Sequence, residues 1–159
     1  MRAKNLVAGV LAVTFLGLAS TVMADDKNPS RCSNKTLKGT YAFSLSGSLS
    51  TGADTYAPEA YAAFVSYDGR GNIALKKSSS IAGEWATRFS TGIYSLGSDC
   101  VGVATYPSGE FSYFVAPDGN SLSFVKISNY VGGEFVPSPD RLSGTAQRVS
   151  TKIIVQPPG

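Results

Sequence analysis

The chain has 159 residues, with 14 basic and 11 acidic side chains and no histidine. Two of the basic residues, Arg2 and Lys4, lie at the extreme N-terminus, so the rest of the chain is nearly neutral, with 12 basic side chains against 11 acidic ones. A protein that binds nucleic acid through its phosphates needs a basic stripe, and this sequence has none. We therefore expect no nucleic-acid partner.

The N-terminus has the pattern of a secretory signal peptide. Its basic residues precede an unbroken apolar stretch at 6–18, which is followed by the small-residue cleavage pattern Val22-Met23-Ala24. The stretch is shorter than the roughly 20 residues that a membrane-spanning helix needs. The pattern predicts a signal peptide over 1–24, one domain over 25–159 and an exported protein, periplasmic or secreted. An uncleaved membrane anchor is the alternative.

Cys32 and Cys100 are the two cysteines of the chain. An even number of cysteines in an exported protein normally oxidises to disulfides, so we expect one bridge between them. In the chain-entropy account, closing the loop of about 69 residues between these cysteines contributes on the order of 4 kcal/mol to the free energy of unfolding. Two free thiols, the alternative, would need a reducing compartment, which the signal peptide argues against.

The first strands show the two-residue alternation of β-structure, and no segment has the period of an amphipathic helix. Tyr41, Phe43 and Leu45 share one face of a strand that begins after Gly39. A second strand over 61–67 is followed by the turn signal Asp68-Gly69-Arg70-Gly71-Asn72. That turn predicts a hairpin into a third strand. Ile73, Leu75 and Lys77 alternate along this strand and share one of its faces.

Five further runs show the same alternation between Gly- and Pro-containing turns, and the two longest connections are expected at 46–58 and 130–139. Short turns between about eight strands favour an all-β fold, a single antiparallel up-and-down barrel of about eight strands with one disulfide. An open sandwich is the alternative. The five runs are 85–94, 100–106, 110–116, 122–127 and 142–149.

Four segments, taken in order, resemble small exported bacterial proteins of uncharacterised function that have a lipocalin-like or allene-oxide-cyclase-like β-barrel. These segments are the opening strand at 32–43, the hairpin Asp68-Gly69-Arg70-Gly71-Asn72, the central strand at 99–105 preceded by Tyr94, and the closing strand at 143–148. The resemblance implies a β-barrel fold and an exported location. It implies no catalytic residues.

The residue inventory disfavours an enzyme. Without histidine, a chain has no Ser-His-Asp or Cys-His catalysis, no histidine-ligated zinc and no general base of ordinary neutral pKa. Bridged cysteines leave no thiolate nucleophile, and no Gly-rich phosphate loop opens a helix. We therefore expect no cofactor and no metal.

Carboxylate chemistry is the alternative that this inventory leaves open. Glu84 beside Trp85, or Glu110 at the start of an aromatic strand, could act as an acid or base if an apolar pocket raised its pKa. Solvated carboxylates at strand ends are the simpler interpretation. Asp68 and Asp118 fit turns better than a calcium loop, because a cation follows Asp68 where calcium would need oxygen.

The aromatic residues give the one positive indication of function. If one alternating set points inward, it either fills the barrel or lines a cavity, and core packing alone would explain it. We predict a binding module for a small apolar or aromatic ligand. The residues assigned to its site are Trp85, Tyr41, Phe43, Phe111, Tyr113 and Phe124.

Two other classes of function stay open. A protein-interaction or inhibitor-type surface factor would have a packed barrel and exposed apolar residues in the segments 46–58 or 130–139. A cofactor-free barrel isomerase would need a hydrophobic pocket with one buried carboxylate. We do not expect a membrane-embedded barrel, because most runs are 6–8 residues long where such strands need about 9 to 11, and lysines fall on either face.

Overall fold

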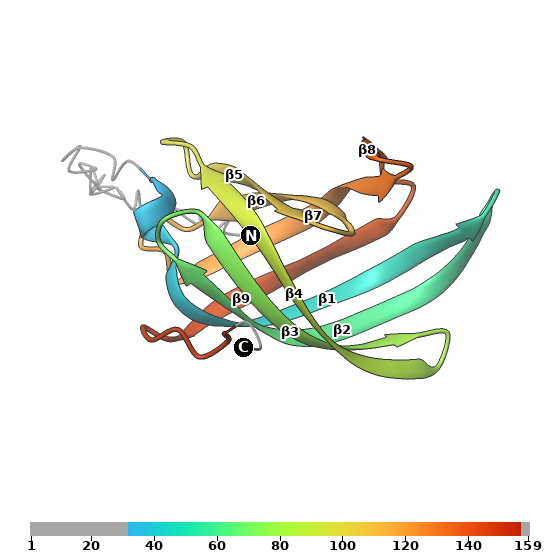
Figure 1. Ribbon diagram of the computed structural model, residues 1–159, viewed down its shortest axis with the longest axis horizontal. Coiled ribbons are helices and arrows are strands. Elements are labelled where there is room, and N and C mark those ends of the chain that lie inside the picture. The colour runs from blue at the N-terminus through green and yellow to red at the C-terminus, as the bar shows by residue number, and fades with distance from the viewer. Residues whose placement is uncertain (1–31, 157–159) are drawn as a thin grey trace, which may run out of the picture.

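The computed structural model describes residues 32–156, so the predicted signal peptide lies outside the described residues. The chain begins with one short 3-10 helix, η1 (Asn34–Thr36), and then forms β-strands (Figure 1). Within 32–156 no helix has the length and apolar character needed to cross a membrane. The strands are β1 (Lys38–Gly52), β2 (Thr55–Asp68), β3 (Asn72–Ile81), β4 (Glu84–Leu96), β5 (Val101–Tyr106), β6 (Gly109–Val115), β7 (Ser121–Val131), β8 (Glu134–Pro137) and β9 (Arg141–Ser150).

Eight of these strands close an antiparallel barrel. Each strand from β1 to β6 pairs with its successor, β7 pairs with β9, and β9 pairs with β1. The remaining strand, β8, forms a hairpin on the far half of β7 and takes no part in closing the barrel. The predicted single up-and-down barrel of about eight strands is therefore confirmed, and closure removes the edges that an open sandwich would expose.

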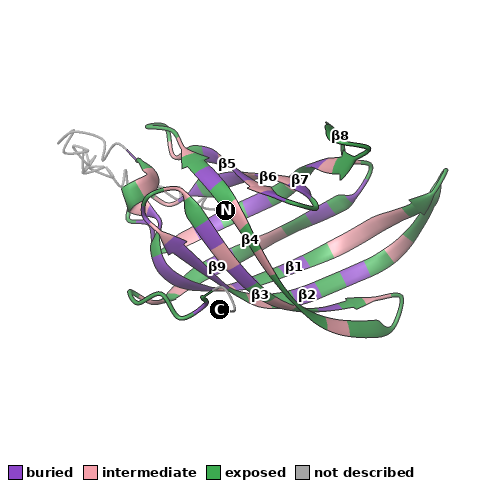
Figure 2. Cartoon of the chain, viewed as in Figure 1, coloured by how far each residue is buried: buried purple, intermediate pink, exposed green. Residues whose placement is uncertain are grey.

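The two ends of the barrel differ. At one end, on the left of Figure 1, lie η1, the β2–β3 turn and the C-terminal segment, and we call it the closed end. At the other lie the tips of the β1–β2, β3–β4 and β7–β8 hairpins, and we call it the mouth. Figure 2 shows buried residues gathered towards the closed end and exposed residues along the hairpin tips.

Tyrosine rings pack the barrel near the closed end. Tyr67 is fully buried, and its ring meets those of Tyr41 and Tyr94 edge to face, with centroids 5.2 Å apart in each pair. Tyr113 lies on its other side, at 6.2 Å. These rings come from alternating positions of different strands, so the period of two places them on one inward face.

A network around Arg148 closes this end of the barrel. Its guanidinium donates hydrogen bonds to the carbonyl oxygens of Thr36 (3.0 Å) and Gly119 (2.8 Å) and to the Tyr41 hydroxyl (3.0 Å). That hydroxyl in turn donates to the Gly119 carbonyl at 2.6 Å. Gly119 has a φ of +66°, and a Cβ there would overlap the Thr36 carbonyl, so glycine is required where the turn meets η1.

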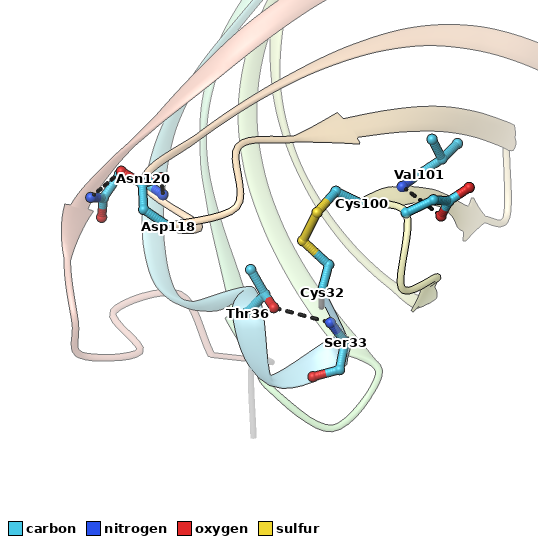
Figure 3. Close-up of a disulfide and its surroundings, with 8 residues drawn as sticks. Cys32, Ser33, Thr36, Cys100, Val101, Asp118 and Asn120 are labelled. Atoms are coloured by element: carbon cyan, nitrogen blue, oxygen red, sulfur yellow. Dashed lines mark hydrogen bonds between the residues drawn. A yellow bond between two sulfur atoms is a disulfide. The ribbon is translucent and has the colours of Figure 1, made fainter. Parts of the chain in front are cut away.

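The predicted disulfide Cys32–Cys100 is confirmed, and it lies at the closed end. It joins Cys32, two residues before η1, to the turn between β4 and β5, and the β6–β7 turn that carries Asp118 and Asn120 lies at the same end (Figure 3). The Tyr94 hydroxyl donates a hydrogen bond to the Leu37 carbonyl oxygen at 2.9 Å, and this bond also holds the segment between Cys32 and β1 in place. A disulfide is compatible with an extracytoplasmic protein.

The strands of the first half are longer than expected. The segment 46–58, predicted as a connection, belongs to β1 and β2, which pair from Lys38 and Asp68 up to Gly52 and Thr55. Alternation marks a strand only where one face is buried, and here the hairpin extends beyond the packed core, so its sequence reads as a loop. The expected length of 6–8 residues was therefore wrong for β1 to β4, which have 10 to 15 residues, and for β7, which has 11.

The segment 130–139 was expected as a second long connection, and this was wrong in part. It contains the end of β7 and the whole of β8, which pair from Ser128 and Pro137 to Val131 and Glu134. Gly132 and Gly133 form the tip, both with positive φ. This hairpin leans away from β9, which pairs with β7 only as far as Val125.

Candidate functional site

The barrel wall is incomplete at the mouth. β4 pairs with β5 only over 93–96, so among the described strands its residues 84–92 pair with β3 alone. On the opposite side, β9 stops pairing with β7 where the β8 hairpin begins. The interior of the barrel is therefore reachable from the mouth and from the side beside β4.

A cavity of about 330 Å³ lies at this opening. Its floor is aromatic and consists of Phe43, Tyr61 and Phe111, and the rings of Phe43 and Tyr61 stack with centroids 6.0 Å apart. The volume is in the range of sites that bury a small organic molecule. The other lining residues are Leu49, Glu59, Leu75, Lys77, Ile81, Arg88, Phe89, Ser90, Tyr106, Pro107, Ser108, Lys126 and Leu142.

Charged groups line the cavity above this floor. The ammonium group of Lys77 lies over the ring of Tyr61, 4.7 Å from its centroid. Burial lowers the pKa of Lys77, the nearby cations Arg88 and Lys126 lower it further, and the carboxylate of Glu59 opposes them. Burial, with a smaller contribution from Glu59, raises the pKa of the Tyr61 hydroxyl. That hydroxyl therefore stays protonated and neutral near neutral pH.

One of the cations is neutralised by an ion pair within the protein. The Lys126 ammonium donates to Oδ2 of Asp140 at 2.6 Å, and both side chains are nearly buried, with 9% and 2% of their surface exposed. The other oxygen of Asp140 accepts a hydrogen bond from the Ser50 amide at 2.8 Å. Burial raises the pKa of Asp140, but these two partners outweigh it and leave the pKa below its ordinary value. The pair ties β7, β1 and the start of β9 together at the mouth.

Glu59 is the carboxylate that reaches the cavity. It is buried, with 6% of its surface exposed, and makes no side-chain hydrogen bond or ion pair with another residue of 32–156. Its oxygens are therefore available to a bound molecule. The cavity can thus hold an apolar body, offer cations to an anion and accept a hydrogen bond through Glu59.

The sequence-predicted site residues divide into three groups. Phe43 and Phe111 line the cavity. Tyr41, Tyr113 and Phe124 are in the packed core and line none of the cavity, although Phe124 stacks on Phe43 at 3.9 Å and supports its floor. Trp85 lies near the β3–β4 tip with 78% of its surface exposed, so the structure does not bring it to the cavity.

Sequence reasoning missed the charged residues of the cavity. Lys77 shares its strand face with Ile73 and Leu75, and that alternation was the signal that its side chain points inward. Glu59 has the same relation to Tyr61, but it lies between the expected connection at 46–58 and the expected strand at 61–67. For Arg88 no such signal exists, because its neighbours two positions away on β4, Ala86 and Ser90, are small residues.

The two carboxylates considered for acid–base chemistry lie elsewhere. Glu84 is exposed at the tip of the β3–β4 hairpin. Glu110 accepts hydrogen bonds from Ser128 (3.0 Å) and Thr105 (3.3 Å). Neither lines the cavity.

Asp68 and Asp118 hold turns, as the sequence indicated. Oδ1 of Asp68 accepts backbone hydrogen bonds from Arg70 (2.7 Å) and Asn72 (3.0 Å), and Oδ1 of Asp118 accepts one from Asn120 (2.9 Å). Burial raises the pKa of Asp68, but the bonds from Asn72 and its neighbours lower it below the ordinary value. Within 32–156 no group of three or more His, Cys, Asp or Glu side chains could hold a metal ion.

A second hollow, of about 520 Å³, lies outside the barrel wall. It is bounded by β3, β4 and the C-terminal segment, which crosses the wall where Val155 donates its amide hydrogen to the Ser66 hydroxyl at 3.0 Å. Its acidic residue, Asp68, is engaged by the β2–β3 turn. This hollow has neither the aromatic floor nor the cations of the mouth cavity, which we take as the candidate site.

Comparison with known protein families and with curated proteins found no family and no protein that matches this chain.

Proposed function

We propose that this protein binds a small apolar or aromatic molecule in the mouth cavity and acts as a binding module or carrier. The observation that carries the proposal is the contrast within one barrel: tyrosines and Arg148 fill the closed end, whereas the mouth holds a cavity of about 330 Å³ with an aromatic floor. Burying apolar ligand surface against such a floor yields roughly 25 cal/mol per Å² before the costs of association.

The shape of the wall supports entry of a ligand without unfolding. The gap beside residues 84–92 of β4 adjoins the lining residues Ser90 and Pro107, so a flat ring can enter between β4 and the β5–β6 turn. The floor residues Phe43 and Phe111 are then positioned for stacked or edge-to-face contacts.

The proposal is tested with the neutral fluorescent dye N-phenyl-1-naphthylamine. We expect saturable binding to the purified protein and its loss in Ser90→Trp, because the indole would occupy the cavity that Ser90 lines. The matched control is Ser95→Trp on the same strand, since Ser95 is exposed and lines none of the cavity. Circular dichroism of both variants reports that they are folded.

Two outcomes contradict the proposal. One is absence of saturable binding to the unmodified protein. The other is equal binding to folded Ser90→Trp and Ser95→Trp, which would place the dye on the outer surface.

An exported location and kinship with lipocalin-like barrels are part of the same proposal. The disulfide supports the first, because such bonds persist in oxidising compartments. The closed eight-stranded barrel supports the second at the level of architecture.

A protein-binding surface is the second candidate, and the β7–β8 hairpin favours it. Tyr130 and Phe135 pack side by side with centroids 5.0 Å apart, yet 49% and 44% of their surfaces are exposed, next to Val131 at 60%. Protein purified from its own source and analysed by native mass spectrometry would carry a partner, and the double variant Tyr130→Ser/Phe135→Ser would lose it. A partner that stays bound to that variant argues against this surface.

A further inference from the structure

We propose that the ligand of the mouth cavity is an amphipathic monoanion, whose carboxylate or sulfonate group binds between Lys77 and Arg88 while its apolar body lies on the aromatic floor. This inference rests on the proposed function and names the chemical class of its ligand. Four observations carry it: the register of β3 and β4, the partners of the neighbouring charges, the charge balance of the cavity, and the chemistry of the two cations.

The register places the two cations opposite each other. Lys77 on β3 and Arg88 on β4 are direct cross-strand partners, and both line the cavity. Side chains in this relation have Cβ atoms about 5 Å apart, and like charges there destabilise a sheet. A bound anion converts this repulsion into two attractions.

The other charged residues relieve this pair only in part, through the Glu59 carboxylate, which favours the charged form of Lys77. Lys126 is held by Asp140 at 2.6 Å and is thereby neutralised. Glu59 pairs in register with Ile81, four residues along β3 from Lys77, and the Lys77 ammonium lies over the Tyr61 ring, 4.7 Å from its centroid. Among residues 32–156 neither Lys77 nor Arg88 has a carboxylate within ion-pair distance.

The charge balance predicts how many negative charges the ligand carries. Once the Lys126–Asp140 pair is set aside, the cavity holds two cations, Lys77 and Arg88, and one carboxylate, Glu59. One additional negative charge makes the site neutral. A dianion would leave a surplus negative charge next to Glu59, and a cationic ligand would add to the repulsion.

The chemistry of the two cations suits an oxyanion. A guanidinium offers two parallel N–H donors that match a carboxylate, and an ammonium provides a compact charge beside it. Lys77 is half-buried, so its bond to an anion is stronger than it would be in water, whereas Arg88 is exposed. The floor of Phe43, Tyr61 and Phe111 lies within the same cavity, so head group and apolar body are bound together.

The experiment compares two dyes that share one ring system. N-phenyl-1-naphthylamine is neutral, and 1-anilinonaphthalene-8-sulfonate carries one sulfonate. We expect Lys77→Met and Arg88→Met each to lower the ratio of sulfonate-dye affinity to neutral-dye affinity by about tenfold, the equivalent of one charge-assisted hydrogen bond. Lys76→Met is the matched control, because Lys76 is the exposed neighbour of Lys77 on the same strand and lines none of the cavity. It should leave the ratio unchanged.

Two measurements make the test independent of how well these variants fold. Added salt should weaken binding of the sulfonate dye to the unmodified protein and leave binding of the neutral dye in place. Glu59→Gln, which removes a cavity carboxylate that has no partner within residues 32–156, should tighten binding of the sulfonate dye several-fold.

The outcomes separate this inference from the proposed function. If the neutral dye binds in the cavity but the affinity ratio is the same in Lys77→Met, Arg88→Met and Lys76→Met, the monoanion is excluded and the binding module stands. If the sulfonate dye is insensitive to salt and to Glu59→Gln, the monoanion is excluded as well. If neither dye binds the unmodified protein, both proposals fail.

Discussion

The closed end and the mouth are built from the same strands but use their polar groups in opposite ways. At the closed end the Arg148 guanidinium finds protein acceptors on Thr36, Gly119 and Tyr41. At the mouth the guanidinium of Arg88 faces Lys77 and a cavity instead. One arginine is therefore part of the framework, whereas the other is available to a ligand.

One barrel can thus combine stability at one end with a binding site at the other. Polar groups that the protein itself satisfies, as around Arg148, stabilise the fold and specify its geometry, whereas like charges that face each other, as Lys77 and Arg88 do, lower stability until an anion binds between them. The closed end carries the disulfide and the tyrosine cluster, so the mouth can tolerate an incomplete wall. Three experiments test this difference between the two ends.

The largest effect is expected from the disulfide. The double variant Cys32→Ser/Cys100→Ser should lower the free energy of unfolding by about 4 kcal/mol, because a long loop of the unfolded chain is no longer closed. The thermal midpoint should fall by roughly 15 °C, measured by differential scanning calorimetry. Below that midpoint, binding of the neutral dye should persist, since the bridge is at the other end of the barrel. A midpoint within a few degrees of the unmodified protein would remove the bridge from the account of stability.

A matched pair of arginine substitutions gives the next effect. Arg148→Met should lower the free energy of unfolding by about 3 kcal/mol, because the guanidinium hydrogen bonds to Thr36, Gly119 and Tyr41 are lost and the Thr36 carbonyl loses its side-chain donor. Arg88→Met should leave stability unchanged or raise it by about 0.5 kcal/mol, since it relieves the repulsion with Lys77. Urea unfolding of both variants measures the difference. Equal losses of stability would show that the two ends are not specialised.

The smallest effect is expected from a matched pair of tyrosines in the core. Tyr41→Phe should cost about 1.5 kcal/mol, because the hydroxyl that links Arg148 to Gly119 is lost. Tyr67→Phe should be neutral or stabilising by up to about 1 kcal/mol, since the buried Tyr67 hydroxyl has no hydrogen-bond partner among the described residues. Both values come from urea unfolding at neutral pH. A loss in Tyr67→Phe as large as that in Tyr41→Phe would point to a partner for this hydroxyl.

Much of the fold could be predicted because the signals that specify it are local. The alternation of Tyr41, Phe43 and Leu45 needs only the two-residue period of a strand, and the Asp68 turn needs only its own five residues. Two cysteines in one chain leave a single pairing. Strand type, turns, the strand number of the barrel and the bridge were therefore accessible from the sequence.

The site was accessible only in part, because its polar members give no hydrophobic signal. Phe43 and Phe111 were assigned by their aromatic character, and the same criterion selected Trp85, which faces solvent. Arg88 is indistinguishable in sequence from the charged residues of any outer strand face, and Glu59 alternates with Tyr61 only in a strand that begins earlier than the sequence indicated. A charged side chain that points into a barrel is recognised only when the strands around it are placed.

The sequence by itself determined an all-β chain with inward aromatic residues and one bridge, since period, turn chemistry and cysteine count are properties of neighbouring residues. Three features appear only in the tertiary structure: one end is filled and the other hollow, residues 84–92 of β4 do not pair with β5, and Lys77 lies opposite Arg88. These features depend on register and closure between strands far apart in the chain, and a period of two is compatible with many registers.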